Sequence, residues 1–159
     1  MKSNNFDALE AILNEDIDFV EKIRAISDTV KSLVHAERCS IFIHDAISKS
    51  FWSAYIEGVS YIEIPEKVGI VGKVFQSKET LIVNDVQNDA NHHKTIDAKS
   101  QFITHSMIAA PIKDRDGKVV GVMQLLNKLD SDQLFTNQDI EHLREALSYI
   151  KDYISRFIK

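Results

Sequence analysis

Apolar residues recur every three or four positions in both terminal parts of the chain. Between residues 6 and 34 they alternate with Glu, Asp, Lys and Arg, which is the pattern of one long amphipathic helix. A second seam runs from residue 136 to the end in steps of three and four, as in a heptad repeat, and Thr136 or Asn137 suits its N-cap. The positions of this second seam are Ile140, Leu143, Leu147, Ile150, Ile154 and Phe157.

The central part of the chain has the composition of β-strands. Residues 38–44 and 50–57 are rich in β-branched and aromatic side chains and are separated by a short polar link, which predicts a β-hairpin. Residues 107–112 and 119–126 are almost continuously apolar and are joined through Asp116-Gly117, a strong hairpin signal. Continuous apolarity predicts strands that are buried on both faces.

Shorter segments lie between the two hairpins. Residues 61–64 and 80–83 predict short extended segments, and residues 69–75 predict a short helix that begins at a glycine. Residues 84–106 are polar, without Gly or Pro, and a segment of this length is more often a functional loop than a linker. The elements together predict an α+β fold: an antiparallel sheet of five to six strands, long terminal helices on one face, and a helical or loop pocket cover on the other.

Length and composition predict a single domain. The chain has 159 residues, of which 44% are hydrophobic and 27% are charged, as in ordinary globular proteins. All five glycines and both prolines lie between residues 58 and 121, so tight backbone geometry is confined to the middle. The expected division of the domain 1–159 is an N-terminal helix at 1–36, a pocket-bearing sheet with loops at 37–134, and a C-terminal helix at 136–159.

Charge and cysteine content exclude several classes of protein. The net charge is −5 and the basic residues are scattered, which argues against a nucleic-acid partner. No apolar run is long enough for a membrane span, and the N-terminus lacks the pattern of a signal peptide. Cys39 is the single cysteine, so an internal disulfide is impossible and a cytoplasmic setting fits. Because Cys39 lies in an apolar strand, we expect a buried, inert thiol.

The chain lacks the common catalytic and phosphate-binding motifs, and no cofactor is expected. His92, His93 and His105 have the spacing of no standard metal site, although an axial haem ligand among them is kept open as a minor alternative. A polar loop over an apolar sheet is typical of a small-molecule pocket. Gln124 interrupts the last apolar run, so its amide should face that pocket or a backbone partner.

Several short stretches occur in a characteristic order. They are residues 38–45, Ile64-Pro65 with 69–74, Asn84-Asp85, and residues 102–104 running into 110–112 and 121–128. In this order and at this spacing, the chain from about residue 33 to residue 139 resembles a GAF domain. GAF domains are ligand-sensing modules of bacterial signalling proteins and of cyclic-nucleotide phosphodiesterases. The resemblance implies a regulatory domain that is not an enzyme.

The phosphodiesterase branch is similar through a further motif. Asn127-Lys128 is followed by Phe135 and, after three residues, by Asp139, while Ile140 replaces the final Glu of the family pattern. The resemblance implies a Lys128–Asp139 salt bridge that supports the pocket without touching the ligand. The alternative is that Asp139 simply suits the positive end of a helix dipole.

The resemblance also implies a set of ligand-binding positions. An apolar slot would take a purine, His93 would stack on it, hydroxyl groups would meet a cyclic phosphate, and Glu57 would accept hydrogen bonds from guanine. Gln124 replaces a glutamate of the family. The alternative is that these side chains are ordinary core and solvated loop residues. The positions are Ser40, Ile56, Glu57, Ile70, Val71, His93, Asp97, Ser100, Thr104 and Gln124.

These observations favour a non-catalytic sensor. We expect it to bind a cyclic nucleotide or a similar small ligand and to signal through its terminal helices as a homodimer, with a fused or associated effector as the output. A ligand-free dimerisation module is the alternative, and a haem or redox sensor is a minor one. Some single-domain proteins of this length resemble free methionine-sulfoxide reductases, but that chemistry uses several loop cysteines and residues 84–106 contain none.

Overall fold

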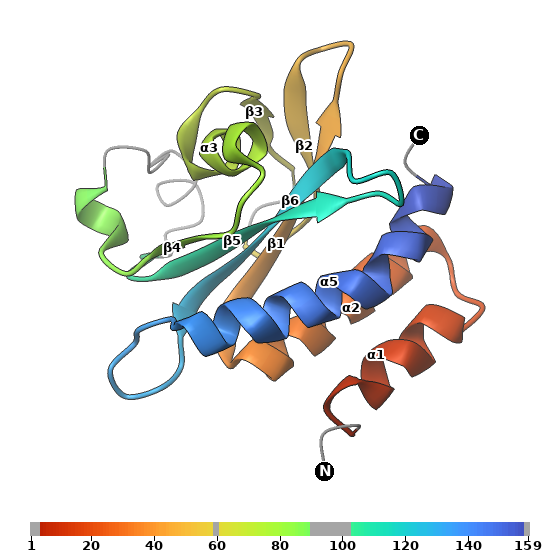
Figure 1. Ribbon diagram of the computed structural model, residues 1–159, viewed down its shortest axis with the longest axis horizontal. Helices are drawn as coiled ribbons and strands as arrows, with labels where there is room; N and C mark the ends of the chain where they lie inside the picture. Colours follow the sequence, from red (N-terminus) through yellow and green to blue (C-terminus); the bar gives the residue numbers. More distant parts are fainter. Residues whose placement is uncertain (1–3, 59–60, 90–102, 158–159) are drawn as a thin grey trace.

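The computed structural model describes residues 4–58, 61–89 and 103–157. A six-stranded antiparallel sheet, in the order β3-β2-β1-β6-β5-β4, lies at the centre (Figure 1). This confirms the predicted α+β class. The elements are α1 (Asn4–Asn14), α2 (Phe19–Val34), β1 (Ala36–Asp45), β2 (Ser50–Ile56), β3 (Glu63–Pro65), α3 (Gly69–Ser77), β4 (Leu81–Val83), the 3-10 helix η1 (Val86–Asn88), β5 (Met107–Lys113), β6 (Val119–Lys128) and α5 (Asn137–Phe157).

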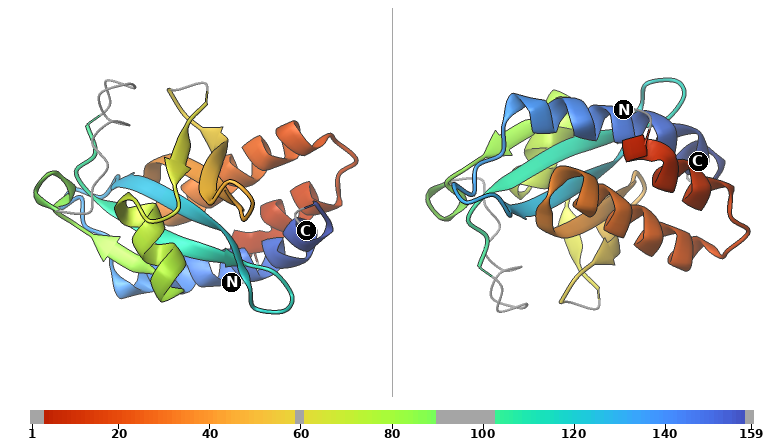
Figure 2. Two further views of the ribbon diagram at one scale, coloured as in Figure 1. Left: turned by 90° about the horizontal axis from the view of Figure 1, so that it is seen from above. Right: turned by 90° about the horizontal axis from the view of Figure 1, so that it is seen from below.

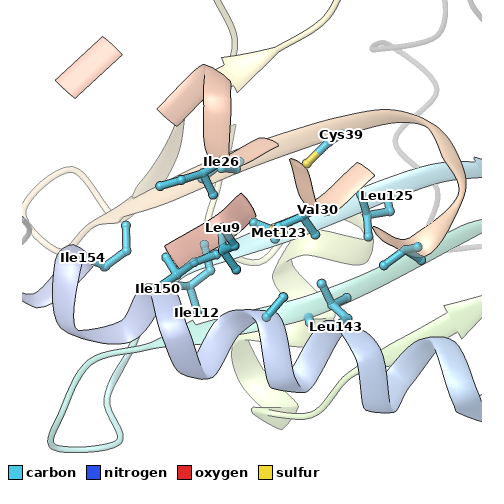
Figure 3. Close-up of a cluster of buried hydrophobic side chains, with 14 of the residues drawn as sticks. Leu9, Ile26, Val30, Cys39, Ile112, Met123, Leu125, Leu143, Ile150 and Ile154 are labelled. Carbon is cyan, nitrogen blue, oxygen red and sulfur yellow. The ribbon is translucent and has the colours of Figure 1, made fainter. Parts of the chain in front are cut away.

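Both faces of the sheet are covered, as the continuous apolar runs predict. Helices α1, α2 and α5 lie on one face, and α3 lies on the other (Figures 1 and 2). Figure 3 shows the core on the helical side, where Leu9, Val30 and Leu143 meet Met123 and Leu125 of β6. On the opposite face, the buried residues include Phe42, Phe51, Ile70, Val74 and Val122. Strand β6 is buried along its entire length because it is central and covered on both sides.

The N-terminal region forms two helices, so the prediction of one long helix from residue 6 to residue 34 is wrong. Asp18 forms the N-cap of α2, and its side chain accepts a hydrogen bond from the N–H three residues later. Lys22 stabilises the turn between the two helices, because its Nζ donates to the carbonyl oxygens of Leu13 at 3.1 Å and Glu15 at 2.5 Å. The bend lets α1 fold back and bury Leu9 against α2 and α5, which a straight helix would expose.

The apolar seam of α5 packs within the chain. Leu143, Ile150 and Ile154 are fully buried in the core shared with α1 and α2, and the ring of Tyr149 stacks on Phe6 with centroids 5.5 Å apart. The seam is therefore explained by coverage of the chain's own sheet. A dimer through the terminal helices stays a prediction.

The remaining elements follow the predicted positions closely. The short helix extends from the predicted glycine to Ser77, and the expected strand at residues 61–64 forms only at Glu63–Pro65. Helix α5 begins at Asn137, which makes Thr136 its N-cap residue. Within residues 4–58, 61–89 and 103–157, no helix combines the length and the apolar composition that a bilayer span needs.

The buried position of Cys39 makes its thiol unreactive in the folded protein. Its exposed fraction is 0%, and burial raises the pKa of the thiol to about 12. Because the thiolate is the reactive form, we expect no reaction with Ellman's reagent at about pH 8 in the native protein, and complete reaction in denaturant. Rapid labelling under native conditions would contradict this placement.

Candidate functional site

Asn127, near the end of β6, organises the segment that leads into β5. Its backbone is left-handed at φ 61°, a conformation that Asn tolerates better than most residues. Its Oδ1 accepts the N–H groups of His105 at 2.6 Å and Ser106 at 3.2 Å, and its Nδ2 donates to the carbonyl of Ile103 at 3.0 Å. A single side chain thus makes hydrogen bonds to the backbone of three residues in the segment 103–106.

The next residue forms the predicted ion pair. Lys128 Nζ lies 2.7 Å from Asp139 Oδ1, and the two side chains are only 10% and 6% exposed. Each charge has a further partner, since Lys128 also donates to the carbonyl of Val34 at 2.7 Å and Asp139 accepts from the N–H of Thr136 at 2.9 Å. The ion pair joins the ends of α2 and β6 to the first turn of α5. The predicted salt bridge is therefore confirmed, while its role in supporting a ligand pocket stays a prediction.

Phe135 of the same motif connects to the start of the polar segment 84–106. Asn84 follows β4, and its Nδ2 donates to the Phe135 carbonyl at 3.1 Å while its Oδ1 accepts the Phe135 N–H at 2.9 Å. Asn127 holds the other end of that segment. Both ends are therefore attached to the connection between β6 and α5. Asn84 belongs to the stretches on which the family resemblance is based, but nothing in the sequence predicted its hydrogen bonds to Phe135.

Ser40 and Gln124 form a polar pair in the centre of the sheet. They lie opposite each other on β1 and β6, and Ser40 also pairs with Ile56 on β2. Strand alternation places them on the same face as Phe42 and Val122, the face that α3 covers. They are 2% and 5% exposed, and in the described part of the chain neither side chain has a hydrogen-bond partner. Such groups are costly unless a ligand or water satisfies them.

Apolar residues predicted for the site lie on this face. Ile70 and Val71 of α3 are buried in the cluster around Phe42, and Ile56 packs against it. Gly72 allows α3 to approach the preceding turn, because a Cβ there would lie 2.7 Å from the carbonyl carbon of Lys67. The structure therefore brings Ile56, Ile70 and Val71 to the face that holds Ser40 and Gln124.

Thr104 lies in the segment held by Asn127 and is 2% exposed. Its backbone carbonyl accepts a hydrogen bond from Gln87 Nε2 at 2.9 Å. His93, Asp97 and Ser100 lie outside the described residues, so their predicted roles remain predictions.

Glu57 lies apart from the other predicted site residues. Its Oε1 accepts hydrogen bonds from Lys31 Nζ at 3.1 Å and from the N–H of Cys39 at 3.3 Å, on the helical side of the sheet. Ile56 is the last residue of β2 and packs on the α3 side, whereas the chain bends at Glu57 and turns its carboxylate toward α2. Burial lowers the pKa of Lys31, but the bond to Glu57 and its charge outweigh burial and raise it. Guanine recognition by Glu57 has no support from this geometry.

A contact that the sequence analysis missed connects β1 to the turn before α3. His44 Nε2 lies 2.8 Å from Glu66 Oε2, and the imidazole stacks on Phe75 with ring centroids 4.3 Å apart. The ring is also 5.1 Å from that of Phe51. These contacts fix α3 against the sheet from both of its ends. His44 and Glu66 are 22 positions apart and share no periodic pattern, so the sequence could not predict this contact.

Comparison with known proteins gives one family. The model of the GAF domain family matches residues 18–150. A dual 3',5'-cyclic-AMP and -GMP phosphodiesterase 11A of Takifugu rubripes is 27% identical over 86% of this chain and 17% of its own length. A cGMP-specific 3',5'-cyclic phosphodiesterase of Drosophila melanogaster is 28% identical over 90% of this chain and 14% of its own length. The chain thus spans less than a fifth of these relatives.

Solved structures share the fold. The A. aeolicus nlh2 GAF domain in an inactive state has a TM-score of 0.73 at 22% identity, covering 97% of this chain and 93% of that one. A free methionine-R-sulfoxide reductase of Neisseria meningitidis has a TM-score of 0.74 at 21% identity, covering 93% and 86%. At these identities the comparison concerns the fold alone.

Removal of the Lys128 charge tests the buried ion pair. Lys128→Met leaves the Asp139 carboxylate buried without its cation, and we expect a loss of about 3–5 kcal/mol in the free energy of unfolding. Arg115→Ala is the matched control, because the Arg115–Asp152 pair has a similar length of 3.0 Å but is exposed. Its expected loss is about 0–1 kcal/mol. Equal small losses in urea unfolding would show that the buried pair does not hold the junction together.

Two substitutions separate the backbone and side-chain roles of Asn127. Asn127→Gly keeps the left-handed backbone but removes the amide, so the amide protons of His105 and Ser106 should exchange faster with solvent. Asn127→Ala should show the same exchange and lose about 1–2 kcal/mol more, because alanine is strained at φ 61°. Unchanged exchange in the glycine variant would mean that residues 103–106 are held by other contacts.

Proposed function

Because the chain belongs to the GAF domain family, we propose that it is a non-catalytic sensor that binds a cyclic nucleotide on the face of the sheet covered by α3. GAF domains are regulatory domains. The main support for the proposal comes from Ser40 and Gln124. Their polar side chains are buried side by side and have no hydrogen-bond partner in the described residues. A ligand with its own donors and acceptors would satisfy both.

The chemistry around the pair fits a small ligand with apolar and polar parts. Ile56, Ile70 and Val71 offer apolar surface, while the hydroxyl of Ser40 and the amide of Gln124 offer directional hydrogen bonds. The Gln124 amide can both donate and accept, so it suits the edges of guanine and adenine alike. Cyclic nucleotides appear in the names of both phosphodiesterase relatives, which favours this ligand class.

The proposal includes a path by which ligand binding would affect α5, the helix that we expect to transmit the signal. Ligand contacts with the segment 84–106 would act on Asn84 and Asn127, which anchor its two ends at the β6–α5 connection. Lys128 and Asp139 connect that junction to α5. The partner that reads α5 would be a second copy or an effector fused to or associated with this domain.

Two other functions have less support. A ligand-free dimerisation module would not require buried polar groups without partners in the centre of the sheet. A methionine-sulfoxide reductase would need reactive cysteines, whereas the single Cys39 is buried on the opposite face and burial raises its pKa. A haem sensor would show a Soret band in the absorption spectrum of the purified protein.

A thermal-shift titration with cyclic GMP and cyclic AMP tests the ligand. A ligand at 100 times its dissociation constant should stabilise the folded domain by about 2.7 kcal/mol, which raises the midpoint of unfolding by several degrees. The corresponding 5'-monophosphates serve as controls for the cyclic phosphate. No shift at millimolar cyclic nucleotide would refute the nucleotide assignment.

Gln124→Met separates binding from folding. The substitution keeps the side-chain volume and removes the buried amide that lacks a partner, so the urea midpoint of the free protein should stay the same or rise. The affinity for the nucleotide should fall about tenfold or more as its hydrogen bond is lost. A destabilised variant with unchanged affinity would place Gln124 in the fold and not in the site.

A further inference from the structure

A groove lies away from the proposed ligand site, between the end of α3, the edge of β5 and the outer face of α5. Its volume is about 630 Å³. Pro111, Ile140 and Leu147 give it an apolar floor, and Lys78, Lys113 and Arg144 are among the cations that line it. We call this the basic groove.

The charge of the basic groove is poorly compensated. It is lined by Lys78, Lys113, Arg144 and Lys151, with Glu79 as its single acidic residue. In the described part of the chain, no ion pair involves any of the three lysines, and Arg144 has only an exposed contact with Glu141 at 3.5 Å. A concentration of positive charge in a chain of net charge −5 favours an acidic occupant.

The geometry disfavours a phosphate group or an added strand. The groove borders the C-terminus of α3, where Lys78 is the left-handed cap, and the first turn of α5 contributes only Ile140, whose N–H already donates to the Thr136 carbonyl. The groove therefore lacks free N–H donors of a helix N-terminus. Pro111 has no N–H for pairing with a further strand at the exposed part of β5. Cations on three separate elements instead suit several carboxylates spread along a folded segment.

The chain carries a segment of that kind at its other end. Residues 15–21, which we call the acidic turn, contain Glu15, Asp16, Asp18 and Glu21 and no basic residue. All four are exposed, and Val20 between them is 69% exposed. Lys22 holds the turn in place through the carbonyls described above. The acidic turn thus presents carboxylates and an apolar side chain on an ordered backbone.

No residue of the acidic turn lines the basic groove of its own chain, and the ring of Phe19 within the turn stacks instead on Tyr153 of α5, with centroids 6.4 Å apart. The acidic turn connects α1 to α2 at one end of the molecule, whereas α3 and β4 lie away from that end (Figures 1 and 2). We propose that the basic groove binds the acidic turn of a second copy of this chain. This contact is independent of whether the sheet binds a nucleotide, and it differs from a dimer through the apolar faces of the terminal helices.

Sedimentation equilibrium of the full chain at two ionic strengths tests the proposal. We expect a mass above 18.1 kDa at low salt and an association constant that falls about tenfold or more between about 0.05 M and 0.5 M NaCl. Lys113→Glu with Arg144→Glu should abolish the association, and so should Glu15→Lys with Asp16→Lys. An equimolar mixture of the two variants should associate again, because each supplies the surface that the other lacks.

Lys67→Glu with Lys118→Glu is the matched control, because it changes the net charge equally at exposed positions outside the groove. It should associate much as the unmodified chain does. A mass of 18.1 kDa at every concentration and salt would overturn the proposal. Association that is insensitive to salt and to charge reversal would also overturn it, and so would a control variant that dissociates as fully as the groove variant. The proposal would likewise be overturned if the chain stayed monomeric and bound phosphatidylserine vesicles through the groove.

Discussion

The ion pair between Lys128 and Asp139 constrains the rest of the site, because two charges at 6–10% exposure are tolerated only when nearly every hydrogen-bonding group has a partner. The Val34 carbonyl is a second acceptor for the lysine, and the Thr136 N–H is a second donor to the carboxylate. Satisfying these groups requires the end of α2, the end of β6 and the start of α5 to meet at one point.

The position of that junction determines how the polar segment 84–106 is held. With α5 starting beside Lys128, the backbone of Phe135 is placed for the amide of Asn84, and Asn127 reaches residues 103–106 from the adjacent position. On the same face, α3 has its own attachment through His44 and Glu66. The two parts around the proposed ligand are thus anchored separately, and in the described residues Asn84 bonds to Phe135, two positions before α5 begins.

Much of this architecture follows from periodicity, because burial on one or both faces leaves a repeating pattern. The two hairpins, α3 and α5 could be predicted for this reason, and the Lys128–Asp139 pair through the resemblance. The break before Asp18 could not, because a hairpin of two helices and one straight helix give the same spacing of apolar residues. The contact of His44 with Glu66 leaves no local pattern. The different environments of Ile56 and Glu57 were hidden as well, because the strand predicted to run through residue 57 ends at Ile56 and the carboxylate of Glu57 meets Lys31 of α2.

The two faces of the sheet differ in the residues that their central strands contribute. On the helical side, positions of the central strands are filled by Cys39, Ile41, Met123 and Leu125, a composition that maximises apolar burial. On the α3 side of the same strand pair, Ser40 and Gln124 stand where apolar residues would stabilise the fold more. Selection for stability alone would not retain a hydroxyl and an amide side by side at 2% and 5% exposure. Their position on the face that α3 covers, and not on the other, is the pattern expected when a bound molecule supplies the missing partners.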